Sequence, residues 1–344
     1  MTPRIIATGS ALPERIVTND DLSRKMDTSD EWIRTRTGIR ERRISEDDGK
    51  EKLLKLSVRA AEAAIAMAEA DGAFSREEIG LVLVATCTPD MAFPAMACRL
   101  QDALSLPQVA AFDLSLACSG FLAALDTASA YIESGRCRTA LVVGGDVMSR
   151  MLNWDDRNTA VLFGDGAGAV ILSADERFIA ACTGGNTAEE KSADEKAADA
   201  FRPRFALHSD GGGEAALYCK AMYFNENEPE SEHMDGRKVF EFAVRKVPEV
   251  IGEVLRLAGT DAEDISLFVL HQANYRIIEA VAKRLKRPIE KFPHNIERCG
   301  NTTAGSMPIL LDELNREGKL RRGDVLCLSG FGAGLSYGAA VLRW

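Results

Sequence analysis

Three side chains in this sequence could supply a nucleophile and two hydrogen-bond donors: Cys118, His271 and Asn301. Cys118 lies in FDLSLACSGF, between a short apolar run and the start of a helical pattern. A sulfur at a helix N-terminus meets unpaired N–H groups and the positive end of the helix dipole, which favour the thiolate. Gly120 allows the sharp strand-to-helix turn that nucleophiles of this kind need. The alternative for Cys118 is an ordinary buried structural cysteine.

His271 and Asn301 each have an ordinary explanation when they are taken alone. His271 ends an apolar run in LFVLHQAN and Asn301 precedes a helical pattern in GNTTAGSMP. A core histidine with satisfied hydrogen bonds and a turn or helix-cap asparagine would fit these positions. Together with Cys118, however, both fall at strand–helix junctions on one edge of the predicted fold. This convergence predicts a catalytic site.

An internal repeat predicts the elements that position these residues. Val58–Ala85 aligns without gaps with Val244–His271: in each copy, Val-Arg opens a helical pattern, and an acidic turn leads to an apolar strand. The strands at 81–85 and 267–271 are continuous apolar runs, which is typical of strands covered on both faces. His271 corresponds to Ala85, so the repeat itself does not require an imidazole.

A second correspondence follows in the same order. A helix after Cys118 ends at Gly135 and leads to a strand at 140–145, and GNTTAGSMPILLDELNREG leads to a strand at 324–330. Residues 160–174 and 328–344 each predict two strands around a glycine-rich bend. Neither bend is GxGxxG and neither opens a helix, which argues against a nicotinamide enzyme.

The repeat implies a duplicated α/β fold with a site between its halves. We divide the chain into an N-terminal half at 1–175 with the nucleophile, a divergent insertion or cap at 176–237, and a C-terminal half at 238–344 with His271 and Asn301. The stretch from about 183 to 237 belongs to neither copy. Its Glu, Lys, Ala, Asn and Asp content is typical of a surface insertion.

Composition limits the classes of partner and compartment. A net charge of −10 over 344 residues argues against nucleic acid as a partner. No apolar run approaches the roughly 18 residues that span a bilayer, and the N-terminus predicts a strand and turn rather than a signal peptide. The eight cysteines show no CxxC and no metal spacing. We therefore expect a cytoplasmic protein with reduced thiols, without a metal and without a membrane segment.

The motifs around the three residues closely resemble those of β-ketoacyl-acyl carrier protein synthase III. This family initiates fatty-acid synthesis and has a thiolase-type fold. The resemblance rests on ACSGF, HQAN and GNTTAGSMP, and extends to TSDEWIRTRTGIRERRI at 28–44, AFP at 92–94, FGDGAGAV at 163–170 and the terminal GFGAGLSYGAAVLRW. It covers nearly the whole chain except about 183–237. Chalcone-synthase-like enzymes share the triad but not EWIRTRTGIRERR. The resemblance implies a thiolase-like α/β unit, with two duplicated halves in α-β-α-β-α layers.

The resemblance also implies a decarboxylative condensation. The Cys118 thiolate would take an acyl group from acetyl-CoA or a similar starter, and malonyl-acyl carrier protein would then lose CO2 and give a 3-oxoacyl product. The N–H groups of Cys118 and Ala333 would form the oxyanion hole, and His271 Nε2 and Asn301 Nδ2 would donate to the enolate oxygen. Coenzyme A enters as part of a substrate, and no cofactor is implied.

Further residues resemble those that hold coenzyme A in the family: Thr28, Trp32, Arg36, Arg157 and Asn274. Trp32 and Arg157 would sandwich the adenine, because arginine stacks well on aromatic rings. The residues alone favour a core or interface aromatic at Trp32. The resemblance assigns Phe93 and Phe163 to the acyl pocket, with Phe93 reaching the pocket of the partner subunit in a homodimer.

A basic stretch stands out against the acidic background. Residues 276–291 contain six basic residues and two glutamates. We predict that it forms a docking surface for the acidic acyl carrier protein, with contacts from Arg276, Lys283 and Arg284. A solvated helix face is an equal explanation. The family tends to have a basic residue where this chain has Glu241, which weakens the docking hypothesis.

The starter acyl group and the acceptor stay open at this stage. The segment 183–237 is longer than we expect for the family and is acidic at 225–232. One alternative is a specialised member that primes a polyketide or passes the acyl group to a small-molecule acceptor. Another is a non-catalytic acyl-binding paralogue, against which the intact Cys, His and Asn argue.

Overall fold

The computed structural model of the protein describes residues 1–46, 52–70, 72–183, 201–220 and 231–344. Its first sheet joins, in spatial order, β1 (Arg4–Ala11), β7 (Gly166–Ser173), β6 (Thr139–Asp146), β4 (Leu81–Ala85) and β5 (Ala110–Leu114). β4 runs parallel to β5 and β6, while β7 is antiparallel to β6 and β1. β4, β6 and β7 are buried along their whole length, as continuous apolar runs predict.

The second sheet joins β11 (Leu267–Leu270), β12 (Val325–Gly332), β13 (Ser336–Arg343) and β8 (Arg204–Ser209). β11 is parallel to β12, and the other pairs are antiparallel. The order β11-β12-β13-β8 therefore repeats β4-β6-β7-β1, with the same directions. This topology confirms the duplication that the sequence repeat predicts. β5, which leads to Cys118, has no counterpart among the described strands of the second sheet.

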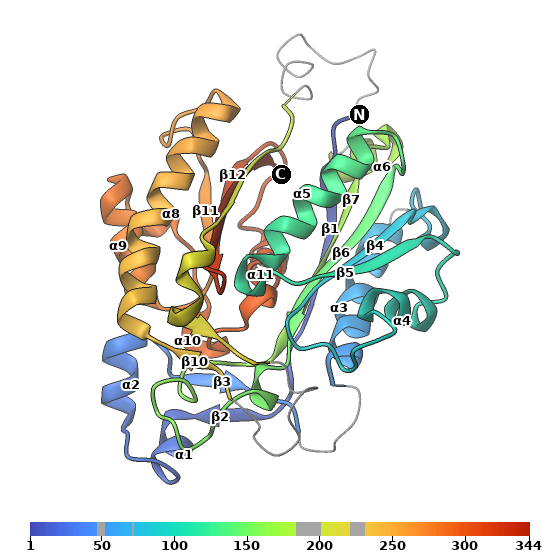
Figure 1. Ribbon diagram of the computed structural model, residues 1–344. Coiled ribbons are helices and arrows are strands. Elements are labelled where there is room, and N and C mark those ends of the chain that lie inside the picture. The colour runs from blue at the N-terminus through green and yellow to red at the C-terminus, as the bar shows by residue number, and fades with distance from the viewer. Residues whose placement is uncertain (47–51, 71, 184–200, 221–230) are drawn as a thin grey trace.

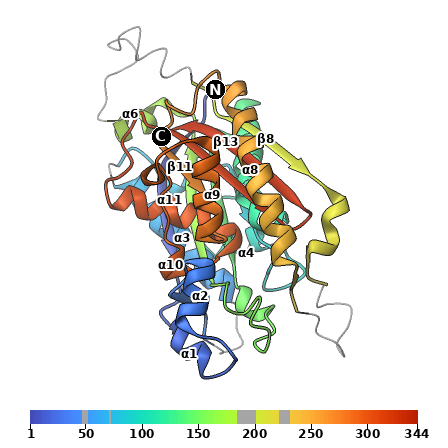
Figure 2. The same cartoon turned by 90° about the vertical axis from the view of Figure 1, so that its left-hand side faces the viewer.

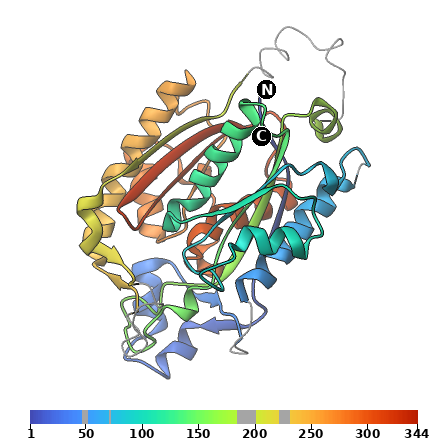
Figure 3. The ribbon, with the colours of Figure 1, turned by 45° about the vertical axis from the view of Figure 1, so that its right-hand side comes forward.

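The helices complete five layers. α5 (Gly120–Glu133) and α11 (Ser306–Arg316) lie between the two sheets (Figure 1). α3 (Lys52–Glu69) and α4 (Met96–Ala103) cover the outer face of the first sheet, and α8 (Gly236–Ala258) and α9 (Tyr275–Leu285) cover that of the second. Figure 3 shows α5 and α11 enclosed between the sheets. The expected α-β-α-β-α arrangement is confirmed.

Glycines in the strands bring the helices close to the sheets. A Cβ added at Gly168 in β7 would lie 2.6 Å from the Ile309 nitrogen of α11, and one at Gly9 in β1 would lie 2.2 Å from the Ala60 oxygen of α3. Real Cβ atoms do not come this close to backbone atoms, so only glycine permits this packing. α11 in the central layer and α3 on the outer face are consequently packed directly against the strands.

A lobe at one end of the molecule carries the segment EWIRTRTGIRERR. It consists of β2 (Ile16–Thr18), α1 (Asn19–Ser23), α2 (Asp30–Thr37) and β3 (Glu41–Arg43), and Figure 2 shows it below the layers. Arg42 is fully buried there and donates from Nη1 to Asn19 Oδ1 and from Nη2 to the Val161 oxygen, at 2.9 and 2.7 Å. Burial lowers the pKa of Arg42 to about 10. The bond to Val161 fastens the lobe to residues 147–165, the connection between β6 and β7.

Short elements complete the described chain. They are α6 (Glu176–Thr183), β9 (Leu217–Tyr218), β10 (His233–Met234) and α10 (Ile296–Cys299). No helix in the described ranges is long and apolar enough to span a bilayer.

The structure corrects three expectations. Residues 160–174 contain one strand, β7, and not two, because the antiparallel neighbour of β7 is β6 and the chain leaves the sheet between them. Helices α3 and α8 begin at Lys52 and Gly236, so Val-Arg of the repeat lies inside each helix and does not open it. The predicted insertion at 176–237 contains β8, the edge strand of the second sheet, which is equivalent to β1. Most of the acidic run at 225–232 lies outside the described residues.

Candidate active site

Cys118 lies at the junction between β5 and α5. It is in a single 3-10 turn, Ala117–Ser119, that continues directly into α5, and the residue is 7% exposed. Ala117 has a φ of 43°, a left-handed value typical of strained nucleophile turns. A Cβ added at Gly332, the last residue of β12, would lie 2.8 Å from the Cys118 nitrogen. The predicted junction is confirmed, and the second sheet ends against it.

His271 follows β11 and is held at both its backbone and its ring. Its N–H donates to the Ser329 oxygen at 2.8 Å, and its Nδ1 lies 2.7 Å from Ser306 Oγ at the start of α11. Ser306 Oγ also accepts from the Gln272 N–H at 3.4 Å. Its own proton is then available for Nδ1, which favours the tautomer with hydrogen on Nε2. His271 therefore offers an Nε2–H donor.

Asn301 is oriented by the turn that precedes α11. The Thr303 N–H donates to Asn301 Oδ1 at 2.9 Å, which identifies the other amide atom as Nδ2. The Asn301 backbone pairs with Phe163 in an isolated bridge. This bridge ties the second half to the connection between β6 and β7. Asn301 Nδ2 is thus left to donate to a ligand.

Two cavities meet at Cys118. The first has a volume of about 460 Å³ and is lined by apolar residues that include Leu116, Met148 and Met151, and also by Ala333. The second has a volume of about 520 Å³ and is lined by Cys118, His271 and Asn301 together with Trp32, Arg36 and Phe331. The structure therefore brings the three sequence-predicted residues to one cavity.

The charge state of Cys118 differs from the sequence expectation. Burial raises the pKa of the Cys118 thiol well above its usual range, and the carboxyl groups of Glu232 and Asp146 raise it further. The helix N-terminus is present as predicted, but burial and these carboxyl groups outweigh it. Burial also lowers the pKa of His271 to about 3. The resting site therefore holds a neutral thiol beside a neutral imidazole.

Asp146, at the end of β6, joins both halves beneath the site. Its Oδ1 accepts from the Thr86 and Thr88 hydroxyls at 2.8 and 3.0 Å, and from the N–H groups of Cys87 and Thr88 at 2.8 and 3.1 Å. Its Oδ2 accepts from Thr303 Oγ1 and from the Ala304 N–H. Asp146 thus links the wall of the first cavity to the turn that orients Asn301.

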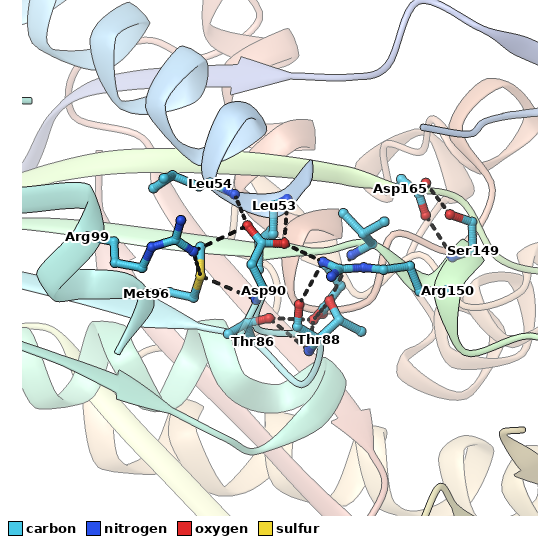
Figure 4. A network of polar contacts seen from close by, with 12 residues as sticks. Leu53, Leu54, Thr86, Thr88, Asp90, Met96, Arg99, Ser149, Arg150 and Asp165 are labelled. Atoms are coloured by element: carbon cyan, nitrogen blue, oxygen red, sulfur yellow. Dashed lines mark hydrogen bonds and ion pairs between the residues drawn. The ribbon is translucent and has the colours of Figure 1, made fainter. Parts of the chain in front are cut away.

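A second buried carboxylate holds the loop that carries Phe93. Figure 4 shows Asp90 between Arg99 and Arg150, with Arg150 Nη2 at 2.6 Å from Oδ1. Asp90 also accepts from the N–H groups of Leu53 and Leu54 at the start of α3, at 3.2 and 2.9 Å. Phe93, three residues on, is 84% exposed and lines neither cavity.

Trp32 lines the second cavity and lies beside two arginine side chains. The guanidinium carbons of Arg36 and Arg157 lie 4.6 and 5.1 Å from the centre of the Trp32 ring. Arg157 is also held by Asp27, through a hydrogen bond of 2.8 Å to its carbonyl oxygen. A partly buried indole beside two guanidinium groups can stack a planar base and bind phosphate.

The other residues assigned to coenzyme A or to the acyl pocket have different surroundings. Thr28 Oγ1 is buried without a hydrogen-bond partner in the described structure. Asn274 lines the second cavity, but its amide caps α9 at the Arg276 N–H and donates to the Arg36 oxygen at 3.0 Å. Phe163, which we expected in the acyl pocket, lines the second cavity beside His271 and not the first. The assignment of Phe163 to the acyl pocket stays a prediction.

The basic residues at 276–291 differ in their surroundings. Arg276, Lys283 and Arg284 are exposed on α9, and Arg276 lines the second cavity and lies over the Phe240 ring. Arg287 and Lys291 instead bond to the loop around Glu263. Of the predicted docking residues, Arg276 therefore lies at the second cavity, and Lys283 and Arg284 follow it along α9.

Several residues of the site were missed by sequence reasoning. Ser306 and Thr303 stand within the GNTTAGSMP motif, but their role depends on contacts with His271 and Asp146 that no local pattern displays. Glu232 lines both cavities, although the acidic stretch around it is typical of a surface segment. No group of three or more His, Cys, Asp or Glu side chains suitable for a metal occurs within the described ranges.

Comparisons with known proteins agree with this geometry. A family model described as 3-oxoacyl-[acyl-carrier-protein] synthase III matches residues 112–186, and one described as its C-terminal region matches residues 255–344. The chain is 44% identical to β-ketoacyl-[acyl-carrier-protein] synthase III 1 of Bacillus anthracis, over 100% of this chain and 99% of that protein.

Solved structures show the same likeness. The crystal structure of 3-oxoacyl-[acyl-carrier-protein] synthase III from Aquifex aeolicus is 40% identical, with a TM-score of 0.85 over 99% of this chain and 100% of that one. The priming β-ketosynthase of the R1128 polyketide pathway is 32% identical, with a TM-score of 0.87 over 99% of this chain and 96% of that one.

Proposed function

The chain belongs to the 3-oxoacyl-[acyl-carrier-protein] synthase III family, and we propose that it condenses a short acyl-CoA with malonyl-acyl carrier protein through an acyl-Cys118 intermediate. One observation supports this proposal above the others. Cys118, His271 and Asn301 line a single cavity, and the latter two are oriented to offer N–H donors. A nucleophile with two such donors suits thioester chemistry that develops charge on oxygen.

The first half-reaction transfers the acyl group to the enzyme. The Cys118 sulfur attacks the carbonyl carbon of the acyl-CoA, and the bond to the coenzyme A sulfur breaks. The proton of the Cys118 thiol ends on the released coenzyme A, so no external base is consumed. The N–H groups of Cys118 and Ala333 stabilise the tetrahedral oxyanion. The approach of Gly332 to the Cys118 nitrogen, which places the end of β12 beside Cys118, supports this role for the neighbouring Ala333.

The second half-reaction forms the carbon–carbon bond. Malonyl-acyl carrier protein loses CO2, and the electrons of the broken bond form a thioester enolate. His271 Nε2–H and Asn301 Nδ2–H donate to the enolate oxygen. The enolate carbon then attacks the acyl-Cys118 carbonyl and expels the thiolate, which regains a proton from solvent. A neutral His271 is well suited to this role, because it donates a hydrogen bond without pairing with the carboxylate that must leave.

We propose that the second cavity admits coenzyme A and that the first receives the acyl group. Trp32 and Arg36 line the second cavity and Arg157 lies over the Trp32 ring, an arrangement that suits an adenine and its phosphates. Thr28 and Asn274 stay assigned to the same ligand. The thioester is a substrate, and the chemistry of the site requires no further cofactor.

We further propose that malonyl-acyl carrier protein docks on α9 and that the enzyme acts as a homodimer. Arg276, Lys283 and Arg284 are exposed there, and Glu241 is neutralised by Arg237 at 2.9 Å. The exposed Phe93 on an anchored loop supports insertion into a partner subunit. Free thiols at Cys87, Cys98, Cys118, Cys137, Cys299 and Cys327 and thioester substrates suit the cytoplasm.

Intact-mass measurement tests the acyl-enzyme. Incubation with acetyl-CoA is expected to add one acetyl group to the wild-type chain and none to Cys118→Ala. Cys327→Ala, which removes a buried thiol far from the cavities, serves as the matched control and is expected to be acetylated normally. A wild-type chain without mass gain, or a gain that survives Cys118→Ala, contradicts the proposal.

A second candidate acceptor is kept because of the likeness to a polyketide-priming ketosynthase. It uses the same acyl-Cys118 and differs only in the partner that receives the acyl group. Malonyl-acyl carrier proteins of fatty-acid and polyketide type, malonyl-CoA and small-molecule acceptors, compared by kcat/KM, separate the two functions.

A further inference from the structure

The two cavities share three lining residues: Cys118, Leu217 and Glu232. This inference rests on the proposed function, in which the thioester lies at Cys118 and the acyl group extends into the first cavity. The first atoms of the acyl group then lie where the two cavities meet, a passage that is lined by Cys118, Leu217 and Glu232. An acetyl group is about as large as two water molecules, roughly 60 Å³ at about 30 Å³ each. The first cavity, at about 460 Å³, is several times larger.

Glu232 brings an unsatisfied carboxyl oxygen to this passage. Its backbone N–H donates to the Met151 oxygen at 3.0 Å, which fixes the residue against the wall of the first cavity. Its Oε2 is buried and has no hydrogen-bond partner in the described part of the chain. Arg150 lines the same cavity but is bonded to Asp90, and its buried Nε also lacks a partner among the described residues.

An unsatisfied polar atom at this position has a consequence for the acyl group. A hydrocarbon chain that fills the passage removes water from the carboxyl group and offers no hydrogen bond in return. An acyl group with an oxygen on the carbons next to the thioester replaces that water with a direct hydrogen bond. Sites built around a polar partner discriminate strongly against analogues that lack it.

We propose that Glu232 is a specificity-determining residue that selects acyl groups carrying a hydroxyl or oxo oxygen close to the thioester over plain hydrocarbon acyl groups of equal length. The protonation of Glu232 agrees with this role. Burial, assisted by Asp146, raises the pKa of Glu232 to about 8. At neutral pH the group is mostly a carboxylic acid, which donates and accepts hydrogen bonds without repelling an acyl oxygen.

The experiment compares 3-hydroxybutyryl-CoA with butyryl-CoA, which have the same carbon chain. The rate of Cys118 acylation is followed by intact mass, and kcat/KM is taken for each. The wild-type enzyme is expected to prefer 3-hydroxybutyryl-CoA by about 10-fold or more, since an unpaired buried group costs about that factor. Glu232→Leu is expected to abolish or invert the preference, whereas Glu232→Gln retains it.

Leu217→Met changes the other wall of the passage without adding a polar group, and it is expected to keep the wild-type ratio. A wild-type ratio near one, or a ratio that is the same in Glu232→Leu, overturns the inference and leaves the proposed function intact. Loading of Cys118 by none of the thioesters overturns both. Glu232→Met, which also lacks a hydrogen-bonding group, takes the place of Glu232→Leu if the latter does not fold.

Discussion

Replacing Asp146 by asparagine should show how much the hydrogen bonds of this carboxylate stabilise the site. The substitution keeps the shape of the side chain and exchanges one carboxylate oxygen for an NH2 group. If the amide oxygen takes the place of Oδ1, it keeps the donors from Thr86, Cys87 and Thr88. The NH2 group then faces the Ala304 N–H, which is also a donor.

The expected loss in the free energy of unfolding follows from these contacts. The Ala304 N–H loses its acceptor in a buried place, which costs about 1–3 kcal/mol, and the remaining hydrogen bonds lose their charge assistance. We expect Asp146→Asn to lower the free energy of unfolding by about 2–4 kcal/mol in total. Thr303→Val removes a single donor to Asp146 and is expected to cost about 1–2 kcal/mol. The Asn301 amide should also lose its fixed orientation, because Thr303 holds both groups.

Urea unfolding followed by tryptophan fluorescence measures the loss of unfolding free energy. CO2 release from malonyl-acyl carrier protein measures the effect of the lost Asn301 orientation. Asp146→Asn should also lower the pKa of the Cys118 thiol, since Asp146 helps to raise it; the pH dependence of alkylation by iodoacetamide reports this shift. An unfolding free energy within about 0.5 kcal/mol of wild type refutes the reasoning, since surface changes stay within that range. A loss in Thr303→Val as large as that in Asp146→Asn also refutes it.

Three further outcomes are expected. His271→Ala and Asn301→Ala should each lower malonyl decarboxylation by about 10²–10³ while Cys118 is still acylated; unchanged CO2 release in either variant contradicts the assigned donors. Because the pKa of Glu232 rises from 4.5 to about 8 on folding, the folded state binds more protons between those values, and the unfolding free energy falls by up to about 1.4 kcal/mol per pH unit across this window. Glu232→Gln should remove this slope, and an identical slope in both proteins speaks against the buried carboxyl. Reversing the charge of Arg276, Lys283 and Arg284 together should raise KM for malonyl-acyl carrier protein at least about 10-fold and leave KM for malonyl-CoA unchanged; equal changes for both contradict docking on α9.

The sequence could predict the layers and the placement of Cys118, His271 and Asn301 at one cavity for a shared reason. The apolar runs at β4 and β11 and the helical patterns at α5 and α11 carry their own periodicity, and the repeat fixes their order. Cys118 and Asn301 precede equivalent helices, so the duplication alone brings them to the same level between the sheets. His271 lies at the end of β11, the counterpart of β4, so the duplication also places it at this level.

Other features depend on contacts that no local pattern contains. The edge strand β8 pairs with β13 across more than a hundred residues of sequence, and its own composition does not distinguish it from an insertion. The pKa of Cys118 is set by burial and by Glu232, whereas the sequence displays only the helix N-terminus that opposes them. Glu232 itself lies near an acidic stretch, and no local pattern shows that it precedes β10, which pairs with β9, and that it lines both cavities.

The condensation itself gives the most direct test of the proposed activity. Wild-type protein is supplied with acetyl-CoA and malonyl-acyl carrier protein, and CO2, free coenzyme A and the mass of the carrier protein are followed together. One CO2 and one coenzyme A are expected for each 3-oxobutyryl-acyl carrier protein formed, with no product from Cys118→Ala. Release of coenzyme A without a 3-oxoacyl product, or product that forms without Cys118, would contradict a condensing enzyme that works through this thiol.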